Sequence, residues 1–516
     1  MALALKPGTD WQTTYARAQA VAPEAFRDNG LLNYWGGRWH EGTPRQATSP
    51  LDGGAIIGPP ELDARGAQRA VVESLYQHRT WSMAPLAERK ARVSAAIEDI
   101  AGQRELLALL LVWEIGRTWA AALDDVDRCV DGVRWYLDEI EEMMAGRTPL
   151  RGPVSNIAAW NQPMSVLMHA MLVQTLAGNA AIAKAPSDGG VNCLTLAVAL
   201  AARHGLPLTL VSGNGSELAA SLVSSPVIGC LSFVGGRDPG GAVAAKLFDQ
   251  SKRHVIEAET LNCWGVWEFS DWDTLSAQIR ESFVHGKQRG TAYSRFVVQR
   301  SLFDEFLAAY LPAVRSLAFG HPLAVASPDD PLPALDFGPL ISDRKAKELH
   351  DAVDEAIGHG GVPLHRGLLE DGKFVPGQEI SAYFAPAAIL TPSVLLASRA
   401  ASPLHHTAPF GPVDSIVLVD TEAELLSEMN VGDGSLVASV SCDDESTAHR
   451  LGAGLQAFKI GINRPRSRGD REEVFGGKGA SWHGAFVGGE LLVQSVTYGP
   501  DRLYGNFGAY SQYPTV

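Results

Sequence analysis

Hydrophobic and polar positions follow distinct patterns along the chain. Between residues 63 and 143 apolar residues recur every three or four positions, as in VSAAIEDIAGQRELLALLLVWEIG, which predicts a run of helices. Residues 151–260 instead alternate short apolar segments with helical ones. Strands are predicted in SNIAAW, AAIAKA and LTLVSG, and helices over 164–176 and 191–204. This order predicts βαβ units and a parallel sheet.

The remaining segments extend this α/β prediction. Residues 260–460 repeat the alternation, with strands such as RFVVQ (295–299) and DSIVLVD (414–420) between helices. Residues 30–60 are rich in Gly, Pro and Trp, which is typical of short strands and turns. The tail contains one strand-like run, GELLVQSVTYG (489–499). The length of 516 residues predicts more than one domain.

Composition narrows the class of protein. Lys and Arg total 43 against 58 Asp and Glu, a net charge of −15, so we expect no nucleic-acid partner. Cys129, Cys193, Cys230, Cys263 and Cys442 are scattered, without the spacing of a metal site or a disulfide framework. The most apolar run, 106–112, is closed by Glu114, so it predicts a buried helix rather than a membrane span. We therefore expect a cytoplasmic protein with no bound metal and no membrane partner.

A series of short motifs lies in one order along most of the chain. They are AAWNQP (158–163), AGNAAIAKAPS (177–187), LSFVGGRDPGG (231–241), HVIEAETLN (254–262), GKQRGTAYSR (286–295), FGPLIS (337–342), PFGPV (409–413) and VFGGKGAS (474–481). Together they resemble the aldehyde dehydrogenase superfamily over residues 30–500. The resemblance implies an NAD(P)-dependent oxidoreductase that converts aldehydes to carboxylic acids and assembles as a homodimer or homotetramer.

The resemblance also implies a domain organisation. A Rossmann-like cofactor domain would comprise residues 1–130 and 150–259, and a second α/β domain, the catalytic one, residues 260–460. A small oligomerisation arm would combine residues 131–149 with 478–516. Such arms add strands to the sheet of a neighbouring subunit.

The resemblance implies NAD or NADP as the cofactor, and the departures from the family pattern predict that it binds weakly. The positions implied for it are Trp160, Lys184, Ser187, Gly235, Gly236 and Phe410. Glycines in a strand-to-helix turn let backbone N–H groups approach a pyrophosphate. Ser187 stands where NAD-preferring relatives often carry Glu, which favours tolerance of, or preference for, NADP. The alternative is that Ser187 only caps a helix beginning near Asp188.

Two polar residues match the catalytic positions of the family. Glu257, in the apolar strand VIEAE, matches the general base, and the alternative is a structural Glu paired with Arg253. Asn161 follows a strand end, where its amide and a backbone N–H would stabilise an oxyanion. The alternative is an Asn that satisfies a turn.

The nucleophile is where the chain departs from the family. The resemblance puts Gly290 at the position of the catalytic cysteine, and a glycine forms no covalent adduct. Thr291 lacks a paired base, and Cys263 is predicted to be a buried apolar residue in the next strand. Ala170 and Ala408 replace a Lys and a Glu of the family pattern.

Three hypotheses follow for the activity. The chain is a natural non-catalytic member of the superfamily, or a laboratory variant in which Gly290 replaced the original cysteine, or an enzyme that uses Glu257 and Asn161 without a covalent intermediate. We favour the first, because a laboratory change explains Gly290 alone and leaves Ala170 and Ala408 unexplained. The ligand would be a small aldehyde or acid.

A basic loop bears on the choice of ligand. The loop INRPRSRGDREE contains four arginines, Arg464, Arg466, Arg468 and Arg471. They either favour an acidic substrate or form a solvated basic loop balanced by the neighbouring Asp and Glu residues.

Overall fold

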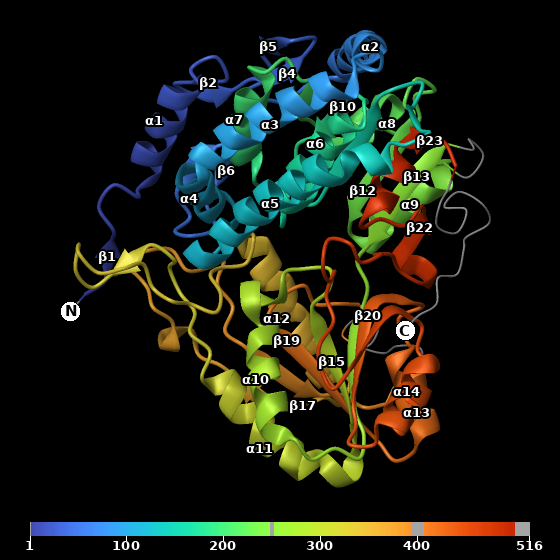
Figure 1. Cartoon of the computed structure of the whole chain (residues 1–516). Helices are drawn as coiled ribbons and strands as arrows, with labels where there is room; N and C mark the ends of the chain where they lie inside the picture. The colour runs from blue at the N-terminus through green and yellow to red at the C-terminus, as the bar shows by residue number, and fades with distance from the viewer. Residues whose placement is uncertain (1, 248–251, 394–403, 405–406, 501–516) are drawn as a thin grey trace.

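Two β-sheets form the centres of two α/β units, the first mainly blue to green and the second mainly yellow-green to orange (Figure 1). The computed structural model describes residues 2–247, 252–393, 404 and 407–500. The predicted α/β class with parallel sheets is confirmed.

The first sheet contains the strands predicted from the βαβ pattern. Across the sheet the order is β22 (Trp482–Gly484), β13 (Arg253–Ala258), β12 (Cys230–Gly235), β9 (Val154–Ala158), β10 (Ala181–Lys184), β11 (Leu208–Val211), β4 (Asn33–Trp35) and β5 (Arg38–His40). The central strands pair in parallel, whereas β4, β5 and β22 add antiparallel edges. The carboxyl ends of β9, β12 and β13 therefore meet at one edge, where ligands of parallel sheets bind.

Helices surround this sheet. They are α1 (Trp11–Val21), α2 (Ala64–Trp81), α3 (Leu86–Gly102), α4 (Arg104–Ile115), α5 (Trp119–Met143), the π-turn η1 (Pro163–Met168), α6 (His169–Leu176), α7 (Val191–Ala202), α8 (Gly215–Leu222) and α9 (Arg237–Leu247). Every residue of α4 from 106 to 115 is buried, as its apolar run predicts. In the described part of the chain, no helix combines the length and apolarity needed to cross a membrane.

The second sheet repeats the parallel arrangement. Its order is β17 (Val362–Arg366), β18 (Ala387–Leu390), β19 (Val413–Val419), β15 (Tyr293–Gln299), β14 (Asn262–Val266), β20 (Ser435–Ser441) and β21 (Ala457–Ile462). Its helices are α10 (Trp272–Ser282), α11 (Phe303–Arg315), α12 (Asp343–Gly358), α13 (Glu422–Met429) and α14 (Glu445–Ala453), with short 3-10 turns η3 (Val284–Lys287), η4 (Arg300–Leu302), η5 (Leu369–Asp371) and η7 (Gly479–Ser481). Apolar strands such as β14 and β20 are buried along their whole length, as expected for a covered parallel sheet.

Small two-stranded pairs join distant segments. They are β1 (Ala4–Leu5) with β16 (Ala324–Val325), β2 (Phe26–Arg27) with β3 (Gly30–Leu31), β6 (Gln46–Thr48) with β7 (Ala55–Ile57), and β8 (Thr148–Pro149) with β23 (Thr497–Tyr498). The last pair brings together both segments predicted for the oligomerisation arm.

The tail corrects one prediction. The strand-like run GELLVQSVTYG folds mainly as helix α15 (Glu490–Ser495), and only Thr497–Tyr498 is extended. The hydroxyls of Ser495 and Thr497 donate to the carbonyls of Leu492 and Val493, which satisfies acceptors at the end of this short helix. In so short a segment, the apolar residues Leu491 and Val493 are buried by one turn of helix as completely as they would be by one face of a strand.

Two of the predicted domain boundaries fall inside elements, and the one at residue 460 lies within β21 (Ala457–Ile462). The boundary between residues 130 and 131 lies inside α5, which is continuous from Trp119 to Met143. β22, assigned to the arm, pairs with β13 at the edge of the first sheet. Residues 501–516 of the predicted arm lie outside the described residues. The role of the whole arm, residues 131–149 with 478–516, in oligomerisation stays a prediction.

Candidate active site

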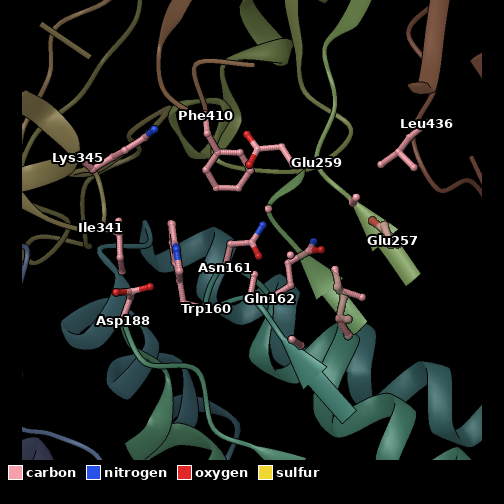
Figure 2. Close-up of a pocket in the computed structure, with 18 of the residues that line it drawn as sticks. Trp160, Asn161, Gln162, Asp188, Glu257, Glu259, Ile341, Lys345, Phe410 and Leu436 are labelled. Atoms are coloured by element: carbon pink, nitrogen blue, oxygen red, sulfur yellow. The ribbon is translucent and has the colours of Figure 1, made fainter. Parts of the chain in front are cut away.

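A cavity of about 210 Å³ lies between the two α/β units, at the carboxyl ends of β9, β12 and β13. The first unit contributes the segment 158–162, which follows β9, and the Gly235–Gly236 turn. Gly290 and Phe410 line it from the second unit. Figure 2 shows Trp160 and Asn161, which follow β9, and Glu257, near the end of β13, around this space. We call it the inner cavity.

A second cavity, of about 620 Å³, opens on the other side of Glu257. Its walls carry aromatic and basic side chains, including Trp135, Tyr136, His169, Arg468, Phe475 and Trp482. Both cavities share Glu257, Gln162, Val166 and Val234 as lining residues. Glu257 thus lies at the junction between the inner cavity and this outer cavity.

Gly290 and Glu257, which the resemblance pairs as nucleophile position and base, lie close together. A Cβ atom built on Gly290 would lie 3.5 Å from Oε1 of Glu257 and 3.5 Å from Cδ1 of Leu436. Asn262 holds the Gly290 loop, donating from Nδ2 to the carbonyls of Gly290 at 2.8 Å and Ala292 at 2.9 Å. The structure therefore brings these two predicted site residues together.

Asn161 reaches the same loop. The side-chain Nδ2 of Asn161 donates to the carbonyl of Gln288 at 3.1 Å, and the Arg117 guanidinium donates to the backbone carbonyl of Asn161. One amide N–H is thereby bound to a distant backbone carbonyl, which differs from the turn role given as the alternative. The second N–H stays available to an oxygen atom in the inner cavity.

Glu257 forms an ion pair, but with a different partner from the one predicted. Nη2 of Arg468 donates to Oε2 of Glu257. Arg253 instead donates to the carbonyls of Gln494 at 3.3 Å and Thr497 at 2.9 Å. The pairing with Arg253 is thus wrong, because Arg253, at the start of β13, lies at the opposite end of the strand from the cavity.

The four arginines of the basic loop divide between the two predicted roles. Arg468 pairs with Glu257, while Arg466 lies 2.9 Å from Oε2 of Glu473. Arg471 lies 3.7 Å from Oδ2 of Asp131, and Arg464 is exposed outside both cavities. Internal acids therefore balance part of the loop, and Arg468 and Arg471 line the outer cavity.

Lys184 and Ser187 contact each other at the end of β10. The buried Nζ of Lys184 donates to Oγ of Ser187 at 3.0 Å and to the carbonyl of Ala185 at 2.9 Å. Burial lowers the pKa of Lys184. The helix-cap interpretation of Ser187 is wrong, because α7 begins only at Val191 and its N-cap is Gly190.

Gly235 and Gly236 form the turn into α9, as the glycine-rich motif predicts. Both line the inner cavity, and the nearest atom to a Cβ on Gly236 would be Cδ of Pro239 at 3.6 Å. Arg237 extends away from the cavity, with Nη1 3.5 Å from the carbonyl of Gly432. The turn therefore presents backbone rather than charge.

Trp160 and Phe410 enclose the inner cavity from opposite units. Their rings meet edge to face, with centroids 6.1 Å apart. Phe410 has a backbone φ of 51°, an unusual conformation for a bulky residue. Strain of this kind is often found at ligand sites, and here it turns an aromatic ring toward the cavity.

The sequence interpretation overlooked Glu259. It lines the inner cavity two residues beyond Glu257, in the motif already quoted for that residue (Figure 2). Burial raises the pKa of Glu259 to about 7, against the opposing effect of Lys345. Alternation along the strand gives the signal that was missed, since residues i and i+2 project to one side. Asp188, in a loop, and Lys345, in the first turn of α12, also lie in the wall and have no such signal.

All five cysteines are buried. Burial raises the pKa of the Cys230 and Cys263 thiols to about 12, so the reactive thiolate is disfavoured. Cys263 lies in β14, the strand that follows Glu257, as predicted. Within the described ranges, neither cavity has a cysteine in its wall.

Comparisons with known proteins agree with this geometry. Residues 39–498 match the model of the family described as the Aldehyde dehydrogenase family. A 3,6-anhydro-alpha-L-galactose dehydrogenase from a Vibrio species is 25% identical over 464 residues, 86% of this chain and 92% of the relative. The N-succinylglutamate 5-semialdehyde dehydrogenase 1 of Caulobacter vibrioides is 27% identical over 452 residues, 84% of this chain and 90% of the relative.

A solved structure extends the likeness to the fold. The NADP-dependent glyceraldehyde-3-phosphate dehydrogenase from Bacillus halodurans, crystallised with NADP, matches with a TM-score of 0.79 at 24% identity. The match covers 92% of this chain and 98% of the other. Both α/β units are therefore arranged as in that protein.

Proposed function

Because this chain belongs to the aldehyde dehydrogenase family, we propose that it binds NAD or NADP together with a small aldehyde or carboxylic acid, without thiol-dependent turnover. One observation carries the proposal. Gly290 occupies the wall of the inner cavity beside Glu257, where a side chain at that position would meet Oε1. A site of the right shape with no nucleophile favours binding over covalent catalysis.

The residues of the inner cavity fit a dinucleotide. Gly235 and Gly236 leave the start of α9 open, so its N–H groups suit a pyrophosphate. Outside the wall of the inner cavity, at the end of β10, Lys184 and the Ser187 hydroxyl would provide donors for a ribose or its phosphate. Trp160 and Phe410 offer apolar surfaces to a nicotinamide. A bound NAD or NADP would supply a hydride acceptor at this end of the cavity.

The chain's own polar groups would orient the second ligand. The free N–H of Asn161 would donate to an aldehyde or acid oxygen, and Glu257 would hold or accept a proton at Oε1. Arg468 already donates to Oε2 of Glu257, so Oε1 is the oxygen left to face a ligand. The Asn161 amide and the Glu257 carboxyl together favour binding of the polar end of an aldehyde or acid at the junction of the cavities.

A spectrophotometric assay tests the absence of turnover. An aldehyde panel is incubated with NAD and with NADP, and reduced cofactor is followed by its absorbance. We expect no measurable rate, since losing a covalent nucleophile costs several powers of ten. A turnover number of roughly 1 per second or more would refute the proposal. If Glu257→Gln abolished that activity, the non-covalent mechanism through Glu257 would replace it.

Calorimetric titration with NAD and NADP tests the binding half separately. We expect saturable binding of at least one cofactor, weakened because Ala408 supplies no carboxylate. Heat changes limited to dilution for both cofactors would refute cofactor binding. That outcome leaves the assay of turnover unaffected.

We also propose a homodimer or homotetramer in which the β8–β23 pair contributes to the contact. This pair combines residues 148–149 with 497–498 in a two-stranded sheet, whose outer edges would be open to a strand of a second subunit. Light scattering after size-exclusion chromatography measures the mass. A mass of 55.1 kDa at micromolar concentration, that of one chain, would refute the proposal.

A further inference from the structure

Three arginines line the outer cavity, Arg128, Arg468 and Arg471. Arg468 is the one that pairs with the carboxylate at the junction of the two cavities. Arg468 donates to Oε2 of Glu257, and the described residues offer its guanidinium no second hydrogen-bond acceptor. The Glu257 side chain is 9% exposed, whereas that of Arg468 is 30% exposed. The guanidinium therefore keeps donors toward the cavity while its partner is almost enclosed.

Arg468 is anchored independently of Glu257. Its Cζ lies 4.4 Å from the ring centroid of Phe475, a cation–π contact, and Lys459 donates to its backbone carbonyl. Loss of the bond to Glu257 would therefore leave the guanidinium in the cavity wall. An arginine held on an aromatic ring is a preformed site for a planar carboxylate.

The acids of the outer cavity do not compete for this cation. Glu473 lies 2.5 Å from Nζ of Lys459 and 2.9 Å from Nη2 of Arg466, so its charge is already balanced. Asp470 and Glu472 are exposed at the rim. The basic residues influence the interior more strongly: burial, and then Arg468, Arg471 and Arg128, lower the pKa of His169 to about 4. The positive charge of these arginines, rather than the burial, favours a negative ligand in this cavity.

Aromatic side chains surround the charge in the wall of the outer cavity. Trp135, Tyr136, Phe475 and Trp482 line the outer cavity together with Leu492. A volume of about 620 Å³ lies within the range of small-molecule sites and accommodates a ring with a short side chain. The combination of one guanidinium and several aromatic faces is complementary to an aryl carboxylate.

We propose that the outer cavity binds an aryl-substituted carboxylate, whose carboxylate takes Arg468 away from Glu257. Ligand binding and the Glu257–Arg468 ion pair are then mutually exclusive, and the ligand releases Glu257 toward Gly290 and the inner cavity. The inference deepens the proposed function and rests on it for the role of the released carboxylate. The binding site itself needs no cofactor.

Competition for one cation makes a specific prediction about Glu257. Calorimetric titrations use 3-phenylpropionate and the neutral 3-phenylpropionamide, without dinucleotide. The protein should bind the acid about tenfold more tightly than the amide, because only the acid forms a hydrogen bond between two charged groups with Arg468. Glu257→Gln, which removes the competitor, should tighten acid binding at least about fivefold and leave amide binding unchanged. Arg468→Gln should abolish the preference for the acid.

Arg464→Gln is the matched control, because Arg464 is in the same loop but exposed outside both cavities. It should leave both affinities unchanged. Equal binding of acid and amide by the unmodified protein, or binding of neither, would overturn the proposal without any variant. Acid binding that Glu257→Gln leaves unchanged or weakens would also overturn it. NAD and NADP titrations on the same samples separate the two proposals, since acid binding without cofactor binding contradicts only the proposed function.

Discussion

Gly290 faces Glu257 across a space that would accept a side chain. A Cβ on Gly290 would stand 3.5 Å from Oε1 of Glu257, an ordinary van der Waals separation, and its backbone lies outside the positive-φ region. Neither steric crowding nor backbone strain requires glycine at this position. The missing side chain is therefore a chemical feature of the site rather than a demand of the fold.

Gly290→Cys should consequently fold and gain a reactive thiol. We expect it to release p-nitrophenol from p-nitrophenyl acetate in a burst, whereas the unmodified chain shows none. Gly290→Ala is the control, because it adds the Cβ without sulfur. Aldehyde oxidation by Gly290→Cys should stay low, since small misplacements of a nicotinamide are costly.

Adding two further changes should improve the restored enzyme. The triple variant Gly290→Cys, Ala170→Lys, Ala408→Glu should oxidise aldehydes faster than Gly290→Cys alone, measured as reduced cofactor per minute. Ala170 lines the outer cavity beside His169, so a lysine there has access to the junction. Full oxidation by Gly290→Cys alone would contradict the non-catalytic hypothesis and show that a single residue had been removed.

Cofactor preference should depend on Ser187. The unmodified chain should bind NADP at least as well as NAD, because Ser187 carries no carboxylate that would repel a 2′-phosphate and contacts the positively charged Lys184. Ser187→Glu should weaken NADP relative to NAD by about tenfold, or 1.4 kcal/mol. Ser187→Gln, of similar size but neutral, is the control in the calorimetric titration. NAD binding tenfold tighter than NADP in the unmodified chain would contradict this argument.

Stability should depend on pH through Glu259. Its pKa of about 7 in the folded chain exceeds the ordinary value of 4.5, so the folded state keeps a proton that the unfolded state releases. The contribution to stability is therefore lost as pH rises from about 4.5 to 7. Glu259→Gln should match the unmodified chain near pH 4.5 and exceed it at pH 8, by up to about 3 kcal/mol.

Urea unfolding across this pH range measures the difference. Glu370→Gln, at an exposed surface position, serves as the control and should shift stability by a constant amount. A difference between Glu259→Gln and the unmodified chain that does not change with pH would contradict the assignment.

The loop of Gly290 should depend on a buried ion pair. Nζ of Lys287 lies 2.5 Å from Oδ1 of Asp414, and the Tyr310 hydroxyl donates to Oδ2 at 2.8 Å, all fully buried. Asp414→Ala leaves the lysine uncompensated and should lower the free energy of unfolding by about 3–5 kcal/mol. The double change Lys287→Met, Asp414→Leu should restore much of it. Equal destabilisation by both variants would show that packing, not charge, dominates.

Much of the fold follows from local pattern. The strands at SNIAAW and LTLVSG and the buried helix α4 appear where periodicity predicts them, because alternation and burial are local properties. The short α15 was misjudged as a strand, because its apolar residues fit one turn of helix as well. That residue 290 is a glycine, and that no cysteine lies in its segment, is read directly from the sequence.

The sequence by itself determined which chemical groups the site contains: an Asn after a strand, a Glu in an apolar strand, and Gly290 without a thiol. Tertiary structure decided which groups meet. Glu257 and Arg468 are 211 positions apart, and Asn161 and the carbonyl of Gln288 are 127 apart. Their contacts arise from the packing of two sheets against each other, a non-local arrangement that periodicity does not encode. Sequence proximity predicts Arg253, four residues away, as the ion-pair partner of Glu257. In the structure the extended strand β13 separates the two side chains, because Arg253 lies at its first residue.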